Sequence, residues 1–265
     1  LEKEIGITIF LRTHKGITPT PEGAEFLKDL RILYQHYNMV LQKYKRGNYK
    51  RKFGVSTQHY SFAVKAFVEM AKQYDMNQFD FAIRETQTRS VIMDVGSLKS
   101  EIGVLYISGP NRKALQKLIA EQELAFHPLI KCEAYVCLWE GHPLAKEKAI
   151  GIDQLEPYPR LSFEQDEEEY FFAEEILSEN VYPQTIKVSD RSTMLNLMVG
   201  LNGYTLCSGI IDNGLNGDGC IVIPFAGSGE NQDSVMEIGY LTKRNSLLSK
   251  MGEQYIKELE NILQL

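Results

Sequence analysis

The sequence predicts an α/β protein in which two α/β units follow a long helix and a short basic segment. After residue 52 the chain alternates between short apolar runs and longer stretches of helical periodicity, a pattern typical of sheets covered by helices. Residues 1–52 hold 11 Lys and Arg against 5 Asp and Glu, whereas residues 53–265 hold 18 against 30. We therefore expect only the N-terminal part to meet a polyanion. A chance asymmetry of a solvated helix is the alternative.

The composition is that of an ordinary globular protein, with 43% hydrophobic and 24% charged residues in 265. No apolar run is long enough to cross a membrane and the start does not resemble a signal peptide, so we expect a cytoplasmic protein with no membrane partner. Its four cysteines, Cys132, Cys137, Cys207 and Cys220, form no CxxC pair and no zinc-like cluster. We expect reduced structural thiols, no metal and no cofactor.

The first 20 residues predict a helix end, a short strand, a tight basic turn and a second short strand. Ile7, Ile9 and Phe10 precede the basic turn "RTHKG" at 12–16, and Thr20 followed by Pro21 is a typical helix start. No initiator methionine and no N-cap precede Leu1. We interpret this segment as the rear portion of a larger unit.

A long helix is predicted from Pro21 to about Arg46, because proline is absent beyond Pro21 and Gly23 is the only glycine. Its apolar positions follow a heptad spacing for nearly three heptads: Phe26, Leu30, Leu33, Tyr37, Val40 and Tyr44. Such a seam favours pairing with the same helix of a second subunit. Packing onto its own body is the alternative. Residues 47–52 are predicted to be a polar linker.

The remaining elements follow from changes of periodicity. Strands are predicted at 51–57, 78–86, 101–108, 134–145, 158–163, 184–189, 204–209, 220–225 and 236–244, and helices at 60–74, 89–100, 170–181, 192–201 and 247–263. Taken in chain order, the elements from the strand at 51–57 to the strand at 101–108 alternate strand, helix, strand, helix, strand. This order predicts a parallel sheet with helices on its faces. Two such units side by side usually hold a small ligand in the crevice between them.

The start of the chain resembles the closing part of the winged helix-turn-helix of LysR-type transcriptional regulators. The matching residues are Leu1, Glu2, Ile5, Gly6, Ile9, Phe10, Arg12, Thr13, Gly16, Ile17, Thr20 and Gly23. Four segments of the body resemble the same family in the same order, namely "FGVST", "SLKSEIGVLYIS", "EGHPLA" and "MLNLMVGLNGYTLCS". The resemblance covers essentially the whole chain.

The resemblance implies a two-lobed effector domain with the fold of type II periplasmic binding proteins, preceded by a linker helix and the end of a winged helix-turn-helix. Residues 1–20 would close the DNA-binding domain, 21–46 would form the dimerisation helix, and 53–265 the effector domain. Lobe one would be 53–128 with 236–265 and lobe two 129–235, with crossing strands near 128–133 and 234–239. Roughly 30 residues with most of the DNA-reading surface would precede Leu1.

In the wing, the resemblance implies contacts with DNA phosphates. The residues concerned are Arg12, Thr13, His14, Lys15 and Thr18. Such contacts position a protein on an operator but carry little sequence information. Merely solvated turn residues are the alternative. Pro19 stands where relatives usually have an apolar strand residue, which leaves the geometry of the wing open.

The resemblance also places an effector at strand-to-helix turns, where hydroxyl and amide groups can hold a carboxylate or another polar head. The residues expected there are Ser56, Thr57, Gln58, Thr86, Gln87, Thr88, Ser162, Phe163, Ser189 and Ser208. Helix capping is the alternative role for each hydroxyl. The acidic stretch "EQDEEEY" at 164–170 is expected to be a solvated loop and helix start, with a cationic effector or a metal as alternatives.

These expectations describe a transcriptional regulator that works as a homodimer or homotetramer on promoter DNA. A small effector would change the arrangement of its subunits, and RNA polymerase is a further candidate partner. A solute-binding protein of a transport system is the rival, since it would share the body fold. An enzyme is disfavoured: His59, His127, His142 and Asp190 are available, but no GxSxG, HExxH, GxxxxGK[ST] or GxGxxG occurs in the required context.

Overall fold

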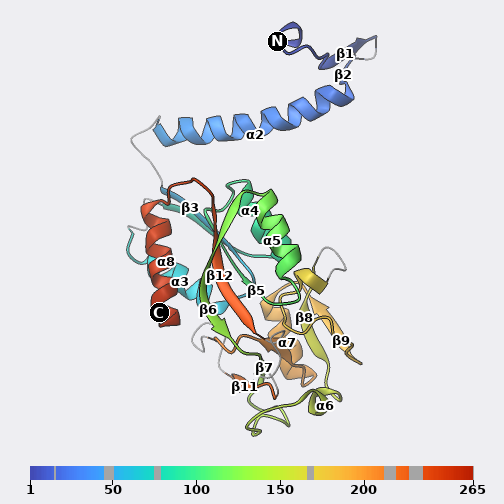
Figure 1. Cartoon of the computed structure of the whole chain (residues 1–265), viewed down its shortest axis with the longest axis vertical. Helices are drawn as coiled ribbons and strands as arrows, with labels where there is room; N and C mark the ends of the chain where they lie inside the picture. The colour runs from blue at the N-terminus through green and yellow to red at the C-terminus, as the bar shows by residue number, and fades with distance from the viewer. Residues whose placement is uncertain are drawn as a thin grey trace. The chain divides into compact units, whose positions relative to one another are not determined.

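The computed structural model describes residues 1–14, 16–44, 51–74, 79–165, 170–211, 219–226 and 235–264 (Figure 1). The chain divides into two compact units, Leu1–Arg51 and Lys52–Leu265. Within these described ranges, no helix combines the length and the apolar character needed to cross a membrane.

The first unit begins with a short helix and a hairpin. Helix α1 (Glu2–Ile5) is followed by strands β1 (Phe10–Thr13) and β2 (Gly16–Pro19), which pair antiparallel. The Glu2 carboxylate accepts the backbone N–H of Ile9 at 2.6 Å and of Phe10 at 3.1 Å, and so ties α1 to the hairpin. Pro19 pairs with Phe10 at the open end of the hairpin. There a missing N–H is tolerated, because each strand of a two-stranded sheet is an edge strand.

Helix α2 (Pro21–Tyr44) follows directly, and its predicted end near Arg46 lies outside the described residues. Thr20 caps it as the sequence predicts: its Oγ1 accepts the N–H of Gly23 at 2.8 Å. The same hydroxyl donates to the carbonyl of Thr8 at 2.5 Å. A Cβ at Gly23 would lie 2.1 Å from the carbonyl oxygen of Ile9, so only glycine lets the helix approach the hairpin this closely.

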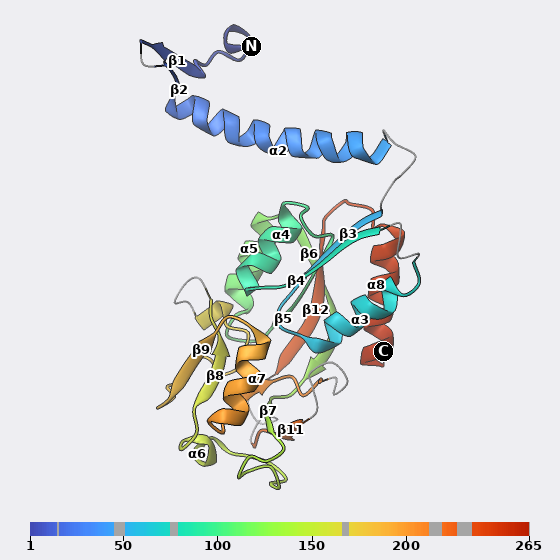
Figure 2. The same cartoon turned by 180° about the vertical axis from the view of Figure 1, so that it is seen from behind.

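A five-stranded sheet forms the first part of the second unit (Figures 1 and 2). Its order is β4 (Phe79–Glu85), β3 (Arg51–Thr57), β5 (Ile102–Ile107), β12 (Met236–Lys243) and β6 (Leu124–Cys132). Strands β3 and β5 are parallel, whereas β12 runs antiparallel to both β5 and β6. The sheet is therefore mixed rather than parallel, because β12 returns to it from near the end of the chain.

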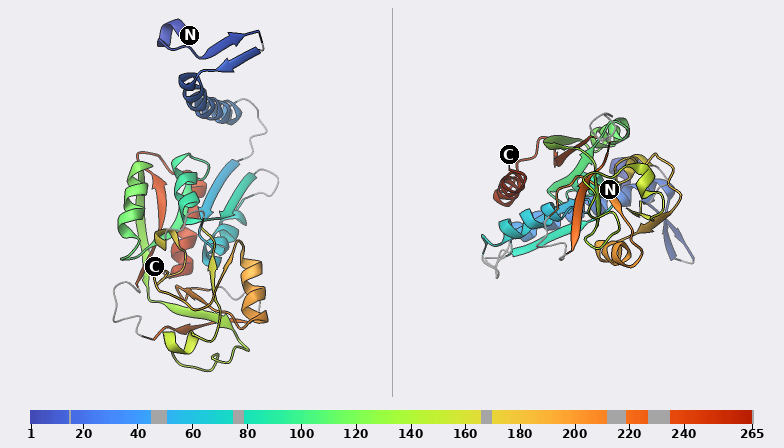
Figure 3. Two further views of the ribbon diagram at one scale, coloured as in Figure 1. Left: turned by 90° about the vertical axis from the view of Figure 1, so that its right-hand side faces the viewer. Right: turned by 90° about the horizontal axis from the view of Figure 1, so that it is seen from below.

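Four helices cover this sheet. The helices α3 (Ser61–Ala71) and α8 (Lys250–Leu263) pack together on one face, and α4 (Thr88–Gly96) and α5 (Arg112–Glu121) lie on the other (Figure 3). Alternate residues of β5 point to opposite faces of the sheet. Ile102, Val104 and Tyr106 pack in the core beneath α3 and α8, and Leu105 and Ile107 pack in the core beneath α4 and α5. Burial on both faces explains the unbroken apolar run of this strand.

The second part is built on two smaller sheets. Strands β10 (Thr205–Cys207), β7 (Tyr135–Trp139) and β11 (Cys220–Pro224) form an antiparallel sheet, and β8 (Arg160–Phe163) pairs parallel with β9 (Thr185–Val188). A parallel bridge between Arg160 and Tyr204 links the two sheets. Helix α7 (Arg191–Gly200) packs on them through Met194 and Met198, and the short α6 (Ile152–Leu155) lies at their far end (Figure 2).

The predicted helix at 170–181 is wrong. Only the single 3-10 turn η1 (Tyr170–Phe172) forms, and the residues after it are irregular. Leu177 has a left-handed backbone with φ +59°, which a helix does not allow. Ile176 and Leu177 are buried, and so are the adjacent Glu174 and Glu175. Four consecutive residues of a helix would face different directions, whereas this irregular segment, with a turn at 176–179, buries all four side chains.

The two parts are connected through β6 and β12. These strands pair from Leu124 opposite Lys243 to Cys132 opposite Met236. Beyond Cys132 the chain enters β7 at Tyr135, and it returns into β12 at Met236. Both connections therefore leave the five-stranded sheet at the same end.

Candidate ligand-binding site

A cavity of about 100 Å³ lies between the two parts of the second unit. The five-stranded part contributes the β3–α3 turn, His59 to Ser61. The same part also contributes Met236 at the start of β12. The second part contributes α7, β10, Cys137 in the middle of β7, Cys220 at the start of β11, and Glu174 and Glu175. Residues distant in sequence thus meet at one place, next to the two connecting strands.

Gln58 and Thr88, two of the residues expected at the effector site, bond to each other. The Gln58 amide donates to Thr88 Oγ1 at 2.5 Å, and its oxygen accepts the Tyr106 N–H at 3.1 Å and the Tyr60 hydroxyl at 3.0 Å. The Gln58 side chain is fully buried. It joins β3, α4 and β5, and none of the ten predicted residues makes more such bonds among the described contacts.

Other predicted residues lie outside the cavity wall. Ser56 donates to Asp94 at 2.7 Å and bonds Ser100 at 2.8 Å within a buried cluster. The backbone of Thr57 accepts the Thr86 N–H at 2.9 Å. Gln87 directly precedes α4, and Ser162 is buried in β8; neither lines the cavity. Ser189 is exposed and precedes Asp190. The cap of α7 is Asp190 itself, which accepts the Thr193 N–H at 2.9 Å.

Phe163 and Ser208 are the two predicted residues that line the cavity. The ring of Phe163 stacks on the imidazole of His59, with 3.7 Å between centroids and 6° between planes. Ser208 follows β10, is buried, and accepts the N–H of Ile210 at 3.3 Å.

A buried contact between His59 and Glu174 joins the two parts at the cavity wall. Glu174 Oε2 lies 2.9 Å from His59 Nδ1 and accepts the His59 backbone N–H at 2.9 Å. Its other oxygen accepts the Gln165 amide at 3.2 Å. The side chains of His59 and Glu174 are 7% and 5% exposed. An ion pair between Arg191 at the start of α7 and Glu85 at the end of β4 also joins the two parts.

The neighbouring Glu175 is also buried in the wall. Its Oε1 accepts the Phe163 N–H at 2.8 Å, while its Oε2 has no hydrogen-bond partner among the described residues. Burial raises the pKa of the Glu175 carboxyl to about 7, although the Arg160 guanidinium acts in the opposite direction. The Tyr106 hydroxyl holds this loop by donating to the carbonyls of Ala173 and Glu175 at 3.2 and 3.3 Å.

Sulfur atoms form the floor of the cavity. Cys137 lies opposite Thr205 and Val222, so Cys207 and Cys220, two residues away on the neighbouring strands, share its face of the sheet. Hydrogen bonding to the Cys137 thiol lowers the pKa of Cys220 to about 7. Within the described parts of the chain, no three His, Cys, Asp or Glu side chains are arranged to hold a metal. Met194, Met198 and Met236 complete the sulfur lining.

Sequence reasoning missed most of this wall. Glu174 and Glu175 fall in the segment that was predicted to be helical, and the three thiols come from strands far apart in sequence. Arg191 directly precedes the helix predicted at 192–201 and was not predicted to be a site residue. One feature of the sequence could have indicated the thiol cluster. The two predicted strands that carry Cys207 and Cys220, at 204–209 and 220–225, fall in the same unit as the strand at 134–145, which carries Cys137.

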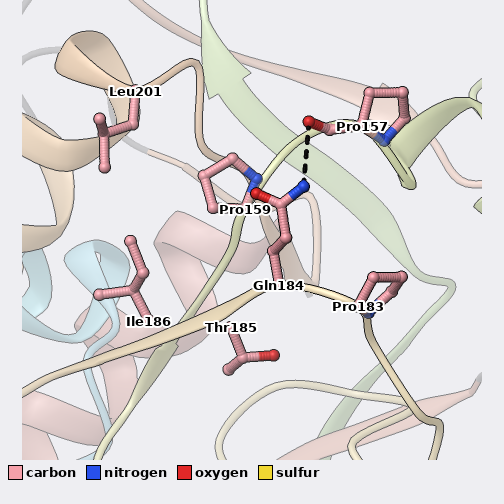
Figure 4. A pocket seen from close by; sticks show the side chains of 7 residues that line it. All are labelled: Pro157, Pro159, Pro183, Gln184, Thr185, Ile186 and Leu201. Carbon is pink, nitrogen blue, oxygen red and sulfur yellow. Dashed lines mark hydrogen bonds between the residues drawn. The ribbon is translucent and has the colours of Figure 1, made fainter.

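A second, wider hollow of about 480 Å³ lies at the outer side of β8 and β9. Figure 4 shows its lining side chains, three prolines with Gln184, Thr185, Ile186 and Leu201. Gln184 donates to the Pro157 carbonyl at 3.4 Å. None of these seven side chains is ionisable.

The first unit exposes the residues predicted to meet DNA and a second subunit. Arg12, His14 and Thr18 are exposed, the Thr13 backbone lies in β1, and Lys15 is outside the described residues. Along α2, exposure is 64% for Leu33, 55% for Tyr37 and 54% for Val40. Phe26 and Leu30 are partly buried, and Tyr44 is the last helical residue.

No protein-family model and no curated protein matches the sequence. Solved structures do match it. An OxyR mutant of Corynebacterium glutamicum is 16% identical, with 99% of this chain and 82% of that one covered at a TM-score of 0.53. HinK, a LysR family regulator of Pseudomonas aeruginosa, is 13% identical over 98% and 85% at 0.54.

The body alone also finds a counterpart. The effector-binding domain of QuiR, solved with shikimate, is 18% identical, with 79% of this chain and 95% of that domain covered at a TM-score of 0.51. At these identities the likeness establishes the fold. Over nearly its whole length the chain has the fold of the LysR-type transcriptional regulators, and its second unit has that of their periplasmic-binding-protein-like effector domains.

Proposed function

We propose that this protein is a LysR-type transcriptional regulator that binds promoter DNA, pairs through α2 and responds to a small molecule held in its second unit. The observation that carries this proposal is the order of hairpin, long helix and two-part body, which matches full-length regulators over nearly the whole chain. The structural neighbours are regulators and not enzymes, which supports a non-catalytic, cytoplasmic role.

The hairpin would contact the DNA backbone. Arg12, His14 and Thr18 are exposed on β1, β2 and the turn, and residues 1–52 carry a net charge of +6. Together with Thr13 and Lys15 they would contact phosphates, which provides affinity and position rather than base selection.

The exposed side of α2 would bind the same helix of a second subunit. Ile32, Leu33, Tyr34, Tyr37 and Val40 are each about half exposed or more, although all are apolar or aromatic. Contiguous apolar surface of this kind usually marks an interaction site. A homodimer, or a homotetramer built from such dimers, would cover it; RNA polymerase is a further candidate partner once the protein is on DNA.

The effector would enter the cavity between the two parts of the second unit. QuiR shows that a domain of this fold can hold a small molecule. Binding would change the arrangement of the subunits only through its different affinity for the two arrangements, with a coupling of about 1–3 kcal/mol. The residues expected from the sequence, such as Gln58, Thr88, Phe163 and Ser208, would line or support that site.

Sedimentation of the full chain tests the proposal. We expect a dimer or tetramer, and a monomer for the double variant Leu33→Asp/Val40→Asp, because two carboxylates would enter the apolar seam. The control is Gln35→Asp, an exposed position two residues beyond Leu33 on the opposite side of the heptad. A monomeric unaltered chain would favour the solute-binding alternative instead.

A further inference from the structure

The anion position at the start of α3 is already filled by the chain itself. Glu174 accepts the backbone N–H of His59 at 2.9 Å, lies 2.9 Å from His59 Nδ1, and receives the Gln165 amide at 3.2 Å. Both carboxylate oxygens therefore have a donor, and the pair is almost fully buried. An effector carboxylate would meet an occupied position beside two acidic side chains.

Glu175, next to it, presents the opposite situation. Its carboxyl is 3% exposed and lines the cavity, and Oε2 has no partner in the described part of the chain. A buried polar oxygen without a partner is costly, so a donor from a ligand would be bound favourably there. The charge of Arg160 acts on Glu175, but among the described contacts no hydrogen bond joins the two side chains. Arg160 donates instead to Ser178 at 2.9 Å and lies over the Tyr182 ring, and Arg191 pairs with Glu85.

The rest of the wall favours an apolar body of limited size. The remaining space is surrounded by apolar and sulfur-containing side chains, namely Cys137, Met194, Leu195, Met198, Cys207 and Ile210. A cavity of about 100 Å³ accepts a molecule of about four to six non-hydrogen atoms, judged against the cavities known to hold small aromatics.

We propose that this cavity takes a small apolar molecule with a hydrogen-bond-donating head, an amine or an alcohol, which Glu175 accepts, and that Glu174 excludes small carboxylates from it. This inference rests on the proposed function, since it defines the chemical class of the effector at that site. The sequence left a carboxylate or another polar head open at the strand-to-helix turns, and this inference excludes the carboxylate.

Calorimetric titration of the full chain at pH 8 with n-butylamine, n-butanol and butyrate tests the proposal, because the three probes share an alkyl body and differ in the head. We expect butylamine, butanol or both to bind and butyrate not to bind. Binding of the amine alone assigns an ammonium head, and binding of the alcohol alone a neutral one. Butyrate binding, or no binding of either donor, overturns the proposal.

Two variants separate the roles of the acids. Glu175→Gln should weaken the donor probe at least tenfold, whereas Glu179→Gln, the same change at an exposed neighbour, should leave it unchanged. Glu174→Ala should acquire butyrate binding, because the alkanoate would replace the missing carboxylate at His59. Should the alanine variant not fold, Glu174→Gln removes the negative charge, and the weaker repulsion should let butyrate bind at least tenfold more tightly than it binds the unaltered chain.

The outcome is distinguishable from that of the proposed function. If butyrate bound and altered the affinity for DNA, the inference on the head group would be wrong and the regulator would stand. If an amine bound but the chain were monomeric and did not bind DNA, the proposed regulatory function would be wrong, whereas the inference on the ligand of the cavity would be supported.

Discussion

Burial at Glu175 couples the protonation of one carboxyl to the stability of the fold. Its pKa is about 7 in the folded chain because desolvation disfavours the anion. The folded state therefore holds a proton that the unfolded chain releases near its ordinary value of 4.5. The stabilisation from this group is present below pH 4.5 and is lost as the pH rises to 7.

We expect the unaltered chain to lose about 1–3 kcal/mol of its free energy of unfolding between pH 5 and pH 7 relative to Glu175→Gln, which cannot titrate. Urea unfolding of both proteins at each pH measures this difference. Parallel pH profiles for the two proteins would show that Glu175 is ionised throughout the range.

Thr20 is a residue whose role the sequence predicted and the structure confirmed. Replacing it by alanine removes the acceptor for the Gly23 N–H at 2.8 Å, which should cost about 1 kcal/mol locally. Hydrogen exchange at the Gly23 amide should become several-fold faster, while Thr20→Ser should retain the protection. Equal protection in the alanine variant would mean that the hydroxyl contributes nothing to the start of α2.

At the scale of elements, the predictions were most accurate where the apolar residues of a segment follow one clear periodicity. The hairpin, α3, α4, α7, α8 and most of the strands were found within a few residues of their predicted bounds, but the strand predicted at 134–145 ends at Trp139. Strand β6 was expected only as a crossing near 128–133, and α5 and α6 were not predicted. The pattern was less informative for α5, where charged residues predominate and Leu115, Leu118 and Ile119 form the buried stripe. Local sequence also did not reveal that β12 joins the first sheet antiparallel.

The segment after η1 shows why the candidate site was harder to predict than the fold. Its two glutamates are helix formers in isolation, and tertiary contacts with His59, Phe163 and Tyr106 override that preference. The cavity depends on such pairings between distant residues. Capping residues at strand-to-helix turns are visible in the sequence, but their partners are not.

At the scale of the whole molecule, the charge of the first unit should govern binding to DNA. In a dimer, Arg12→Gln removes one phosphate contact per subunit, so the slope of log affinity against log salt concentration should fall by about 2 on any duplex. Lys148→Gln, an exposed charge in the second unit, is the control and should leave the slope unchanged. An unchanged slope for Arg12→Gln would place the DNA contact elsewhere.

The contacts between the two parts of the second unit should set how readily these parts separate. Two of them are the contact of His59 with Glu174 and the ion pair of Arg191 with Glu85, and the Tyr106 hydroxyl provides a third. Arg191→Gln should therefore increase hydrogen exchange in the β3–α3 turn and at the start of α7 together, whereas Lys187→Gln, exposed on β9, should change neither. Faster exchange confined to α7 would indicate that this pair does not link the parts.

The carboxylate of Glu174 is a competitor that the chain carries with it. Because it is tethered within a few ångströms of the His59 N–H, its effective concentration there is on the order of millimolar or higher. Free acids must exceed that concentration to displace it, and it never diffuses away. At the effector site that we propose, this competitor would keep acidic metabolites out and leave the cavity to amines and alcohols.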